Sequence, residues 1–219
     1  MLVKENTNPL DPVAGIDEAG RGSLAGPVIA AAVVLHPNRD IDGLRDSKKL
    51  NPDRRKRLYE EITSKAVYWG IGRASAGEID ELNIHHATLL AMTRAWEAMP
   101  IRVGKVLGDG LYCPEVAASC KAVVKGDQTV PVISAASILA KVTRDEEMLG
   151  YHATYPEYGF DQHKGYPTAG HLAALHDHGP CDLHRKSYRP VRYARQIESG
   201  DSKRPGASPR PCAKPVPIP

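Results

Sequence analysis

Two apolar runs near the N-terminus, residues 12–17 and 26–35, are separated only by a short Gly-rich link. Runs rich in Val, Ile and Ala on either side of a glycine-containing turn are typical of a β-hairpin. The link begins with two carboxylates and continues as Ala-Gly-Arg-Gly, so charged groups follow the first strand directly. We therefore expect an antiparallel strand pair with a charged, glycine-rich turn at its end.

The rest of the chain alternates between helical and extended patterns. Asn51-Pro52, Ser75-x-x-Glu78 and Thr168 are signals for the start of a helix. Apolar spacing predicts helices over 52–64, 84–99, 134–149 and 168–178, and short strands over 66–75, 105–107 and 122–124. Strands followed by helices that alternate with further strands predict an α/β layer fold with a mixed sheet.

Composition favours one soluble domain with flexible ends. The 219 residues are 42% apolar and 25% charged, and no apolar run is long enough for a membrane helix. The first residues lack the apolar core of a signal peptide, so we expect a cytoplasmic protein. We expect a flexible lead over 1–10, one folded domain over 11–198 and a disordered, Pro-rich basic tail over 199–219.

Charge and cysteine usage narrow the function classes. The formal net charge of +3 resides in the tail, so residues 1–198 are formally neutral and any nucleic-acid binding needs a local basic patch. No Cys-x-x-Cys spacing occurs, which argues against a zinc site. In a cytoplasmic protein we expect reduced thiols. The cysteines are Cys113, Cys120, Cys181 and Cys212.

Four carboxylates follow short apolar runs. Asp17 and Glu18 end the first predicted strand, Asp109 follows the strand near 105–107, and Asp127 follows the next one. If these strands are neighbours, the carboxylates meet at one sheet edge and raise one another's pKa. Two divalent cations would relieve that repulsion, and carboxylate oxygens suit Mg²⁺ or Mn²⁺. Each carboxylate alone could be a turn residue, but together they favour two-metal phosphodiester hydrolysis.

Several longer motifs resemble the ribonuclease HII family. They occur in family order over roughly residues 13–190: GIDEAGRG at 15–22, DSKKL at 46–50, IDELNI at 79–84, KGD at 125–127, ISAASILAKVTRD at 133–145, HKGYPT at 163–168 and HRKSY at 184–188. The resemblance implies a ribonuclease H-like fold, a five-stranded mixed sheet flanked by helices with a C-terminal helical extension. It also implies an endonuclease that cleaves the RNA strand of RNA–DNA hybrids and nicks DNA 5′ of single embedded ribonucleotides.

The resemblance also assigns roles to individual residues. The metal-binding catalytic carboxylates would be Asp17, Glu18, Asp109 and Asp127, with Mn²⁺ or Mg²⁺ as cofactor. Gly20, Arg21 and Gly22 match the loop that reads the ribonucleotide 2′-OH, which alone distinguishes RNA from DNA at a given position. Tyr166 matches the tyrosine that stacks on the following sugar. An added hydroxyl on that sugar would clash with the ring.

The remaining basic residues are weaker candidates. We expect the helix start at 54–57 to be a solvated basic face, and His184 and Arg185 to anchor the C-terminal segment. Possible phosphate contacts are Lys48, Lys49, Lys125 and Lys164.

Three functions remain open at this stage. The first is a monomeric endonuclease acting on RNA–DNA hybrids and on duplex DNA containing ribonucleotides, away from membranes. It would leave 5′-phosphate and 3′-hydroxyl ends. The second is a hybrid-binding protein without catalysis, against which the carboxylates argue because they would face phosphate. The third is another nuclease of the same fold, such as a resolvase or transposase, which would not need to sense a 2′-OH.

Overall fold

The computed structural model describes residues 12–44 and 50–200. Most of the predicted lead and tail therefore lies outside the described residues, as do Lys48, Lys49 and Cys212. The strands are β1 Val13–Ala19, β2 Val28–Val34, β3 Tyr68–Ala74, β4 Lys105–Asp109 and β5 Ser119–Val123. The helices are α1 Pro52–Lys65, α2 Ala76–Glu97, α3 Gly126–Thr129, α4 Pro131–Thr154, α5 Phe160–His163, α6 Ala169–His178 and α7 Arg189–Gly200, with a 3₁₀ turn at Pro156–Tyr158.

The strands form one mixed sheet in the order β3-β2-β1-β4-β5. β1 pairs antiparallel with β2, from Ala14 opposite Val34 to Ala19 opposite Ile29, which confirms the predicted hairpin. β2 pairs antiparallel with β3, whereas β1, β4 and β5 run parallel. The predicted five-stranded mixed sheet flanked by helices is confirmed.

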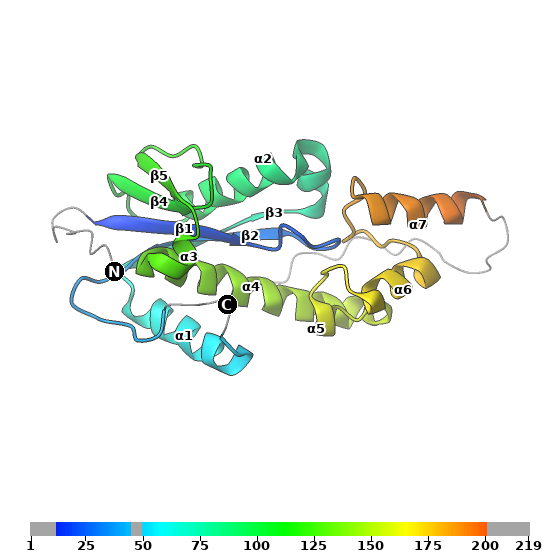
Figure 1. Ribbon diagram of the computed structural model, residues 1–219, viewed down its shortest axis with the longest axis horizontal. Helices are drawn as coiled ribbons and strands as arrows, with labels where there is room; N and C mark the ends of the chain where they lie inside the picture. Colours follow the sequence, from blue (N-terminus) through cyan, green and yellow to red (C-terminus); the bar gives the residue numbers. More distant parts are fainter. Residues whose placement is uncertain (1–11, 45–49, 201–219) are drawn as a thin grey trace.

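Helices cover both faces of the sheet (Figure 1): α2 lies on one face, and α4 with α1 lies on the other. β2 shows why, because all seven of its residues are buried. Val28, Ala30 and Ala32 belong to the core on the α2 side, and the residues between them belong to the core on the α4 side. Successive side chains of a strand point to opposite faces. A strand apolar at every position must therefore be covered twice.

The three predicted helix starts are confirmed. Asn51 accepts a hydrogen bond from the Arg54 backbone N–H at 2.8 Å, and Ser75 and Glu78 form a complete capping box. Thr168 caps α6 in the same way. These caps satisfy backbone donors that a helix cannot satisfy internally.

Helix α2 begins at Ala76, directly after the predicted Ser75 cap, and so includes residues before the helix predicted over 84–99. Asn83 interrupts it with a φ of 66°, a left-handed conformation that Asn tolerates better than most residues. The Asn83 side chain then accepts hydrogen bonds from the backbone N–H groups of His85 and His86, at 2.9 and 3.2 Å. Asn83 thus caps a second helical segment within α2, and this segment corresponds to the helix predicted over 84–99.

The prediction of four reduced thiols is wrong for two of them. Cys113 and Cys120 form a disulfide with a Cα–Cα distance of 5.9 Å. The connection between β4 and β5 doubles back beside β5 and brings the two residues together, although they are seven positions apart. Cys181 is a free thiol, and burial raises its pKa to about 12. In the described part of the chain, no helix is both long and apolar enough to cross a membrane.

Candidate active site

The parallel pairing of β1 with β4 brings the first carboxylates together. The register ends with Ile16 opposite Gly108, so Asp17 and Asp109 both come one residue after the last pair. Asp17 is 5% exposed and contacts Ser137 of α4. Glu18 points to the opposite face of the strand. The strand continues to Ala19, so these two carboxylates lie inside β1 and do not end it.

Asp109 and Asp127 are joined through the backbone that follows β5. The Asp109 carboxylate accepts hydrogen bonds from the N–H groups of Gly126 at 2.7 Å and Asp127 at 3.4 Å. Asp109 ends β4 as predicted, but Asp127 lies in α3, because Lys125 turns the chain at a φ of 55°. Asp127 is fully buried, and the Ser134 hydroxyl donates to its carbonyl. Asp109 therefore fixes the position of Asp127 as well as its own.

The electrostatics of this edge favour a bound cation. Burial raises the pKa of Asp17 well above its ordinary value, and the charges of Glu18 and Asp109 raise that pKa further. Burial also raises the pKa of Glu18, and Asp109 adds to this, while Arg21 opposes it. Neighbouring carboxylates are costly to ionise together unless positive charge lies among them.

The donor set fits Mg²⁺ or Mn²⁺, which prefer carboxylate oxygens. Within residues 12–44 and 50–200, no three His, Cys, Asp or Glu side chains converge closely enough to hold an ion by themselves. Mg²⁺ is ordinarily held by one or two carboxylates together with water and substrate phosphate oxygens. The arrangement of the four carboxylates is therefore compatible with ions that bind together with the substrate.

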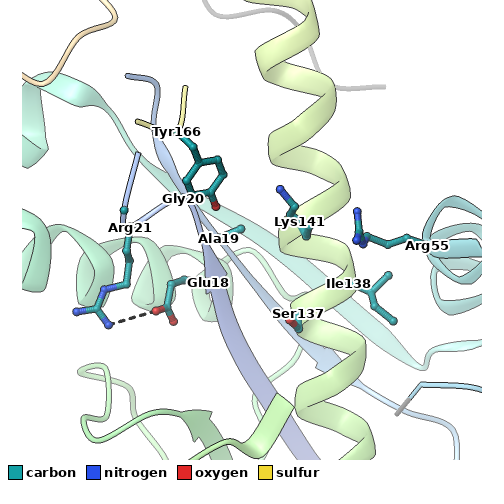
Figure 2. A pocket seen from close by; sticks show the side chains of 10 residues that line it. Glu18, Ala19, Gly20, Arg21, Arg55, Ser137, Ile138, Lys141 and Tyr166 are labelled. Atoms are coloured by element: carbon teal, nitrogen blue, oxygen red, sulfur yellow. Dashed lines mark hydrogen bonds and ion pairs between the residues drawn. The ribbon is translucent and has the colours of Figure 1, made fainter. Parts of the chain in front are cut away.

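A pocket lies beside Glu18 (Figure 2). Arg21 forms an ion pair with Glu18 at 3.3 Å, and Tyr166 stands next to Gly20. The pocket thus combines one catalytic candidate with the entire predicted 2′-OH loop and the predicted stacking tyrosine. Its lining residues are Glu18, Ala19, Gly20, Arg21, Gly22, Arg55, Ser137, Ile138, Lys141 and Tyr166.

Two buried arginines shape the glycine loop. Gly20 has a φ of 96°, and a Cβ there would overlap the side chain of Arg144. The guanidinium of Arg185 donates to the carbonyls of Gly20 at 2.7 Å and Arg21 at 2.8 Å. Both arginines are fully buried. The anchoring role predicted for Arg185 is consistent with these bonds, whereas sequence reasoning missed Arg144.

Two cations lie close to the Tyr166 ring. The Nζ of Lys141 is 5.3 Å and the guanidinium of Arg144 is 5.4 Å from the ring centroid. Sequence reasoning also missed Ser137 and Lys141 as pocket residues. They are four positions apart on α4, and residues with this spacing share a helix face. That spacing within the 133–145 motif was a usable signal.

The predicted basic contacts differ in their positions. Lys125 is exposed beside Asp127, whereas the ammonium of Lys164 donates to the Asp161 carbonyl of its own turn. The prediction of a solvated basic face over 54–57 is wrong for Arg55, which lines the pocket and donates to the Leu50 carbonyl at 2.9 Å. Arg55 lies in the first turn of α1, where its backbone N–H donates to the Asn51 carbonyl at 3.0 Å.

A mixed sheet in this order, with acidic residues gathered beside β1 and β4, defines a metal-dependent nuclease of the ribonuclease H-like class. The family model for ribonuclease HII matches residues 14–191. The chain therefore belongs to the ribonuclease HII family, endoribonucleases that cleave the RNA strand of RNA–DNA hybrids.

Individual relatives agree with this assignment. The chain is 56% identical over 186 residues to the ribonuclease HII of Polynucleobacter necessarius, which covers 83% of this chain and 94% of the relative. It is 58% identical over 180 residues to that of Coxiella burnetii, covering 82% and 89%. The crystal structure of ribonuclease H2 from Pyrococcus horikoshii is similar with a TM-score of 0.73 at 26% identity, covering 87% of this chain and all of that one.

Proposed function

We propose that this chain also nicks duplex DNA on the 5′ side of single embedded ribonucleotides, leaving 5′-phosphate and 3′-hydroxyl ends. One observation carries the proposal: Glu18, the loop from Gly20 to Gly22, and Tyr166 line a single pocket. The group proposed for catalysis and the groups proposed to recognise the ribonucleotide would then contact the same position of the bound strand.

Asp17, Glu18, Asp109 and Asp127 are the residues that would hold Mn²⁺ or Mg²⁺. When bound, such ions activate the attacking water and stabilise the departing oxygen of a phosphodiester. Burial raises the pKa values of Asp17 and Glu18, and the charge of Asp109 raises them further. A bound cation would oppose both effects, which supports this role. Which of the two metals is preferred is decided by assay.

Discrimination would rest on the loop and on Tyr166. Backbone groups around Gly20 and Gly22 can approach a 2′-OH closely, since no Cβ intervenes. The Tyr166 ring would pack on the next sugar and exclude a second hydroxyl there. Lys141 and Arg55, on the opposite wall of the pocket in Figure 2, supply positive charge for the phosphates of the bound strand.

The test is cleavage of a labelled duplex that carries one ribonucleotide, with and without Mn²⁺ or Mg²⁺, and with the ends mapped to one nucleotide. We expect a metal-dependent nick 5′ of the ribonucleotide, and loss of cleavage in Asp109→Asn. That variant should fold, because an Asn oxygen can still accept from Gly126. The matched control is Asp182→Asn, at an exposed carboxylate.

Two outcomes would contradict the proposal. Near-normal turnover by folded Asp109→Asn would remove Asp109 from the mechanism. Binding of the duplex without any nick, at every metal concentration, would instead favour the hybrid-binding alternative for this substrate. Action as a monomer and a cytoplasmic location stay predictions.

A further inference from the structure

Three histidines lie in or close to α5 and α6: His163 ends α5, His171 is in α6, and His184 follows α6 in the chain. Figure 1 shows these two helices beside the end of α4. His171 and His184 are 0% and 1% exposed, and their Nε2 atoms are 3.0 Å apart. The ring of His163 stacks on that of His171, with centroids 4.4 Å apart. None of the three belongs to the pocket lining, so the mechanism above leaves them without a role.

The hydrogen bonds assign the protons of the first two rings. The backbone N–H of Cys181 can only donate, so His184 accepts it at Nδ1, at 3.1 Å. A neutral His184 then carries its proton on Nε2 and donates it to Nε2 of His171. His171 must therefore carry its own proton on Nδ1, where it donates to the Tyr166 carbonyl at 3.0 Å. Each bond in this chain fixes the direction of the next.

This series of hydrogen bonds requires that both His171 and His184 are neutral. Burial lowers the pKa of His171 to about 4 and that of His184 to about 3, so each ring holds one proton at neutral pH. A second proton on His171 would set two N–H groups against each other between the rings, and a second proton on His184 would set an N–H against that of Cys181. The chain therefore has one arrangement near pH 7.

The third histidine, His163, forms a hydrogen bond with Gly165, the residue before Tyr166. His163 donates from Nε2 to the Tyr158 carbonyl at 2.7 Å and accepts the Gly165 N–H at Nδ1, at 3.2 Å. The two stacked imidazoles thus bind neighbouring backbone groups. His163 accepts from the Gly165 N–H, and His171 donates to the Tyr166 carbonyl.

We propose that His171 is a positioning residue for substrate discrimination: through the Tyr166 carbonyl it sets where the tyrosine ring meets the sugar. The inference rests on the proposed role of Tyr166 as the reader of that sugar. The ring's contacts with Lys141 and Arg144 are cation–π contacts, which constrain orientation less sharply than hydrogen bonds do. Its placement consequently depends on the backbone bonds of Tyr166: its carbonyl accepts from His171 and, at 2.8 Å, from the Thr168 N–H, and its N–H donates to the His163 carbonyl at 2.9 Å. Of these three contacts, only the one with His171 is made by a side chain, so a substitution can remove it alone.

Two substitutions separate positioning from packing. The side-chain nitrogen of Asn is bonded to Cγ, as Nδ1 of His is, so His171→Asn can still donate to Tyr166. The side-chain oxygen of Gln can reach the place of Nε2 and accept from His184, so His171→Gln can keep the contact with His184 but not that with Tyr166. We expect the preference for a single ribonucleotide over an all-RNA hybrid strand, measured as a ratio of kcat/KM values, to fall about tenfold in the Gln variant. The Asn variant should keep it within about twofold.

Controls come from the same helix and from Tyr166 itself. His176→Asn, at an exposed histidine of α6, should leave the ratio unchanged. Tyr166→Ala should lower the ratio, and adding His171→Gln to it should lower the ratio no further. A purely structural role would instead reduce activity on both substrates in every background.

The outcomes distinguish this inference from the proposed function. An unchanged ratio in Tyr166→Ala would overturn the role of Tyr166 and the inference together. A lower ratio in Tyr166→Ala with an unchanged ratio in His171→Gln would overturn the inference alone. Long-range ¹H–¹⁵N NMR of the substrate-free protein tests the proton positions without an activity assay. A neutral His171 protonated at Nε2 contradicts the proposed series of hydrogen bonds, and protonation at Nδ1 supports it.

Discussion

Replacing Arg185 with Met should destabilise the fold and the substrate loop together. Met keeps much of the apolar stem but removes every donor. Arg185 donates to the carbonyls of Gly20, Arg21, Gly26 and Pro27, at 2.7 to 3.3 Å. The carbonyls of Arg21 and Pro27 keep a second donor, from Tyr188 and Arg144, in the variant.

The magnitude follows from the other two carbonyls. Gly26 loses both bonds from Arg185, and Gly20 keeps only the long bond from the Ser23 N–H, at 3.3 Å. A buried carbonyl left without a donor costs about 2 kcal/mol, so the two together lose about 3 to 4 kcal/mol. Burial lowers the pKa of Arg185, so removing its charge offsets part of this loss. We expect the free energy of unfolding to fall by about 3 kcal/mol.

Urea unfolding, followed by the fluorescence of Trp69 and Trp96, measures this change at neutral pH. Arg189→Met is the control, because Arg189 is exposed and lies only four positions further along the chain, at the start of α7. It should change the free energy of unfolding by less than about 0.5 kcal/mol. A loss below about 1 kcal/mol in Arg185→Met, or undiminished nicking at single ribonucleotides, would refute the reasoning.

Three further predictions concern stability. His171 and His184 have folded-state pKa values of about 4 and 3, below the ordinary 6.5, so the unfolded chain binds more protons. Unfolding free energy should therefore fall as pH drops from 6.5 toward 4, by at most about 2.7 kcal/mol per pH unit, and a flat profile in urea titrations would contradict this. Reducing the Cys113–Cys120 disulfide should lower it by about 2.5 kcal/mol, measured with and without dithiothreitol. Gly15→Ala, whose Cβ would overlap the Val132 carbonyl, should lose more than about 3 kcal/mol of calorimetric stability.

Features that depend on neighbours in the sequence could be predicted. The caps at Asn51, Ser75 and Thr168 require only a side chain and the next turn of backbone. The hairpin of β1 and β2 likewise follows from two apolar runs and a short link. The gathering of carboxylates could be inferred because parallel strands place their ends at one edge.

Features that depend on contacts with backbone far away in the sequence could not be predicted. Arginine is ordinarily a surface residue, and nothing near Arg144 in the sequence indicates that it donates to the carbonyls of Ala25, Pro27 and Lys164. The Cys113–Cys120 pair was missed because compartment arguments say nothing about how a loop doubles back. Arg55 was missed because the sequence does not show which residue of the basic run 54–57 faces the pocket; that depends on how α1 packs against the rest of the fold.

The bond between Arg185 and Gly20 spans 165 positions, and it has a consequence for the order of biosynthesis. Ribosomes add roughly 5–20 residues per second, so Arg185 is made about 8–30 s after Gly20. During that interval the first three strands can assemble, yet the loop carbonyls still lack the guanidinium that orders them. The ordered form of the loop proposed to recognise a ribonucleotide is thereby reserved for chains whose translation has passed residue 185. A prematurely terminated chain keeps Asp17 and Glu18 but lacks the guanidinium that bonds to this loop.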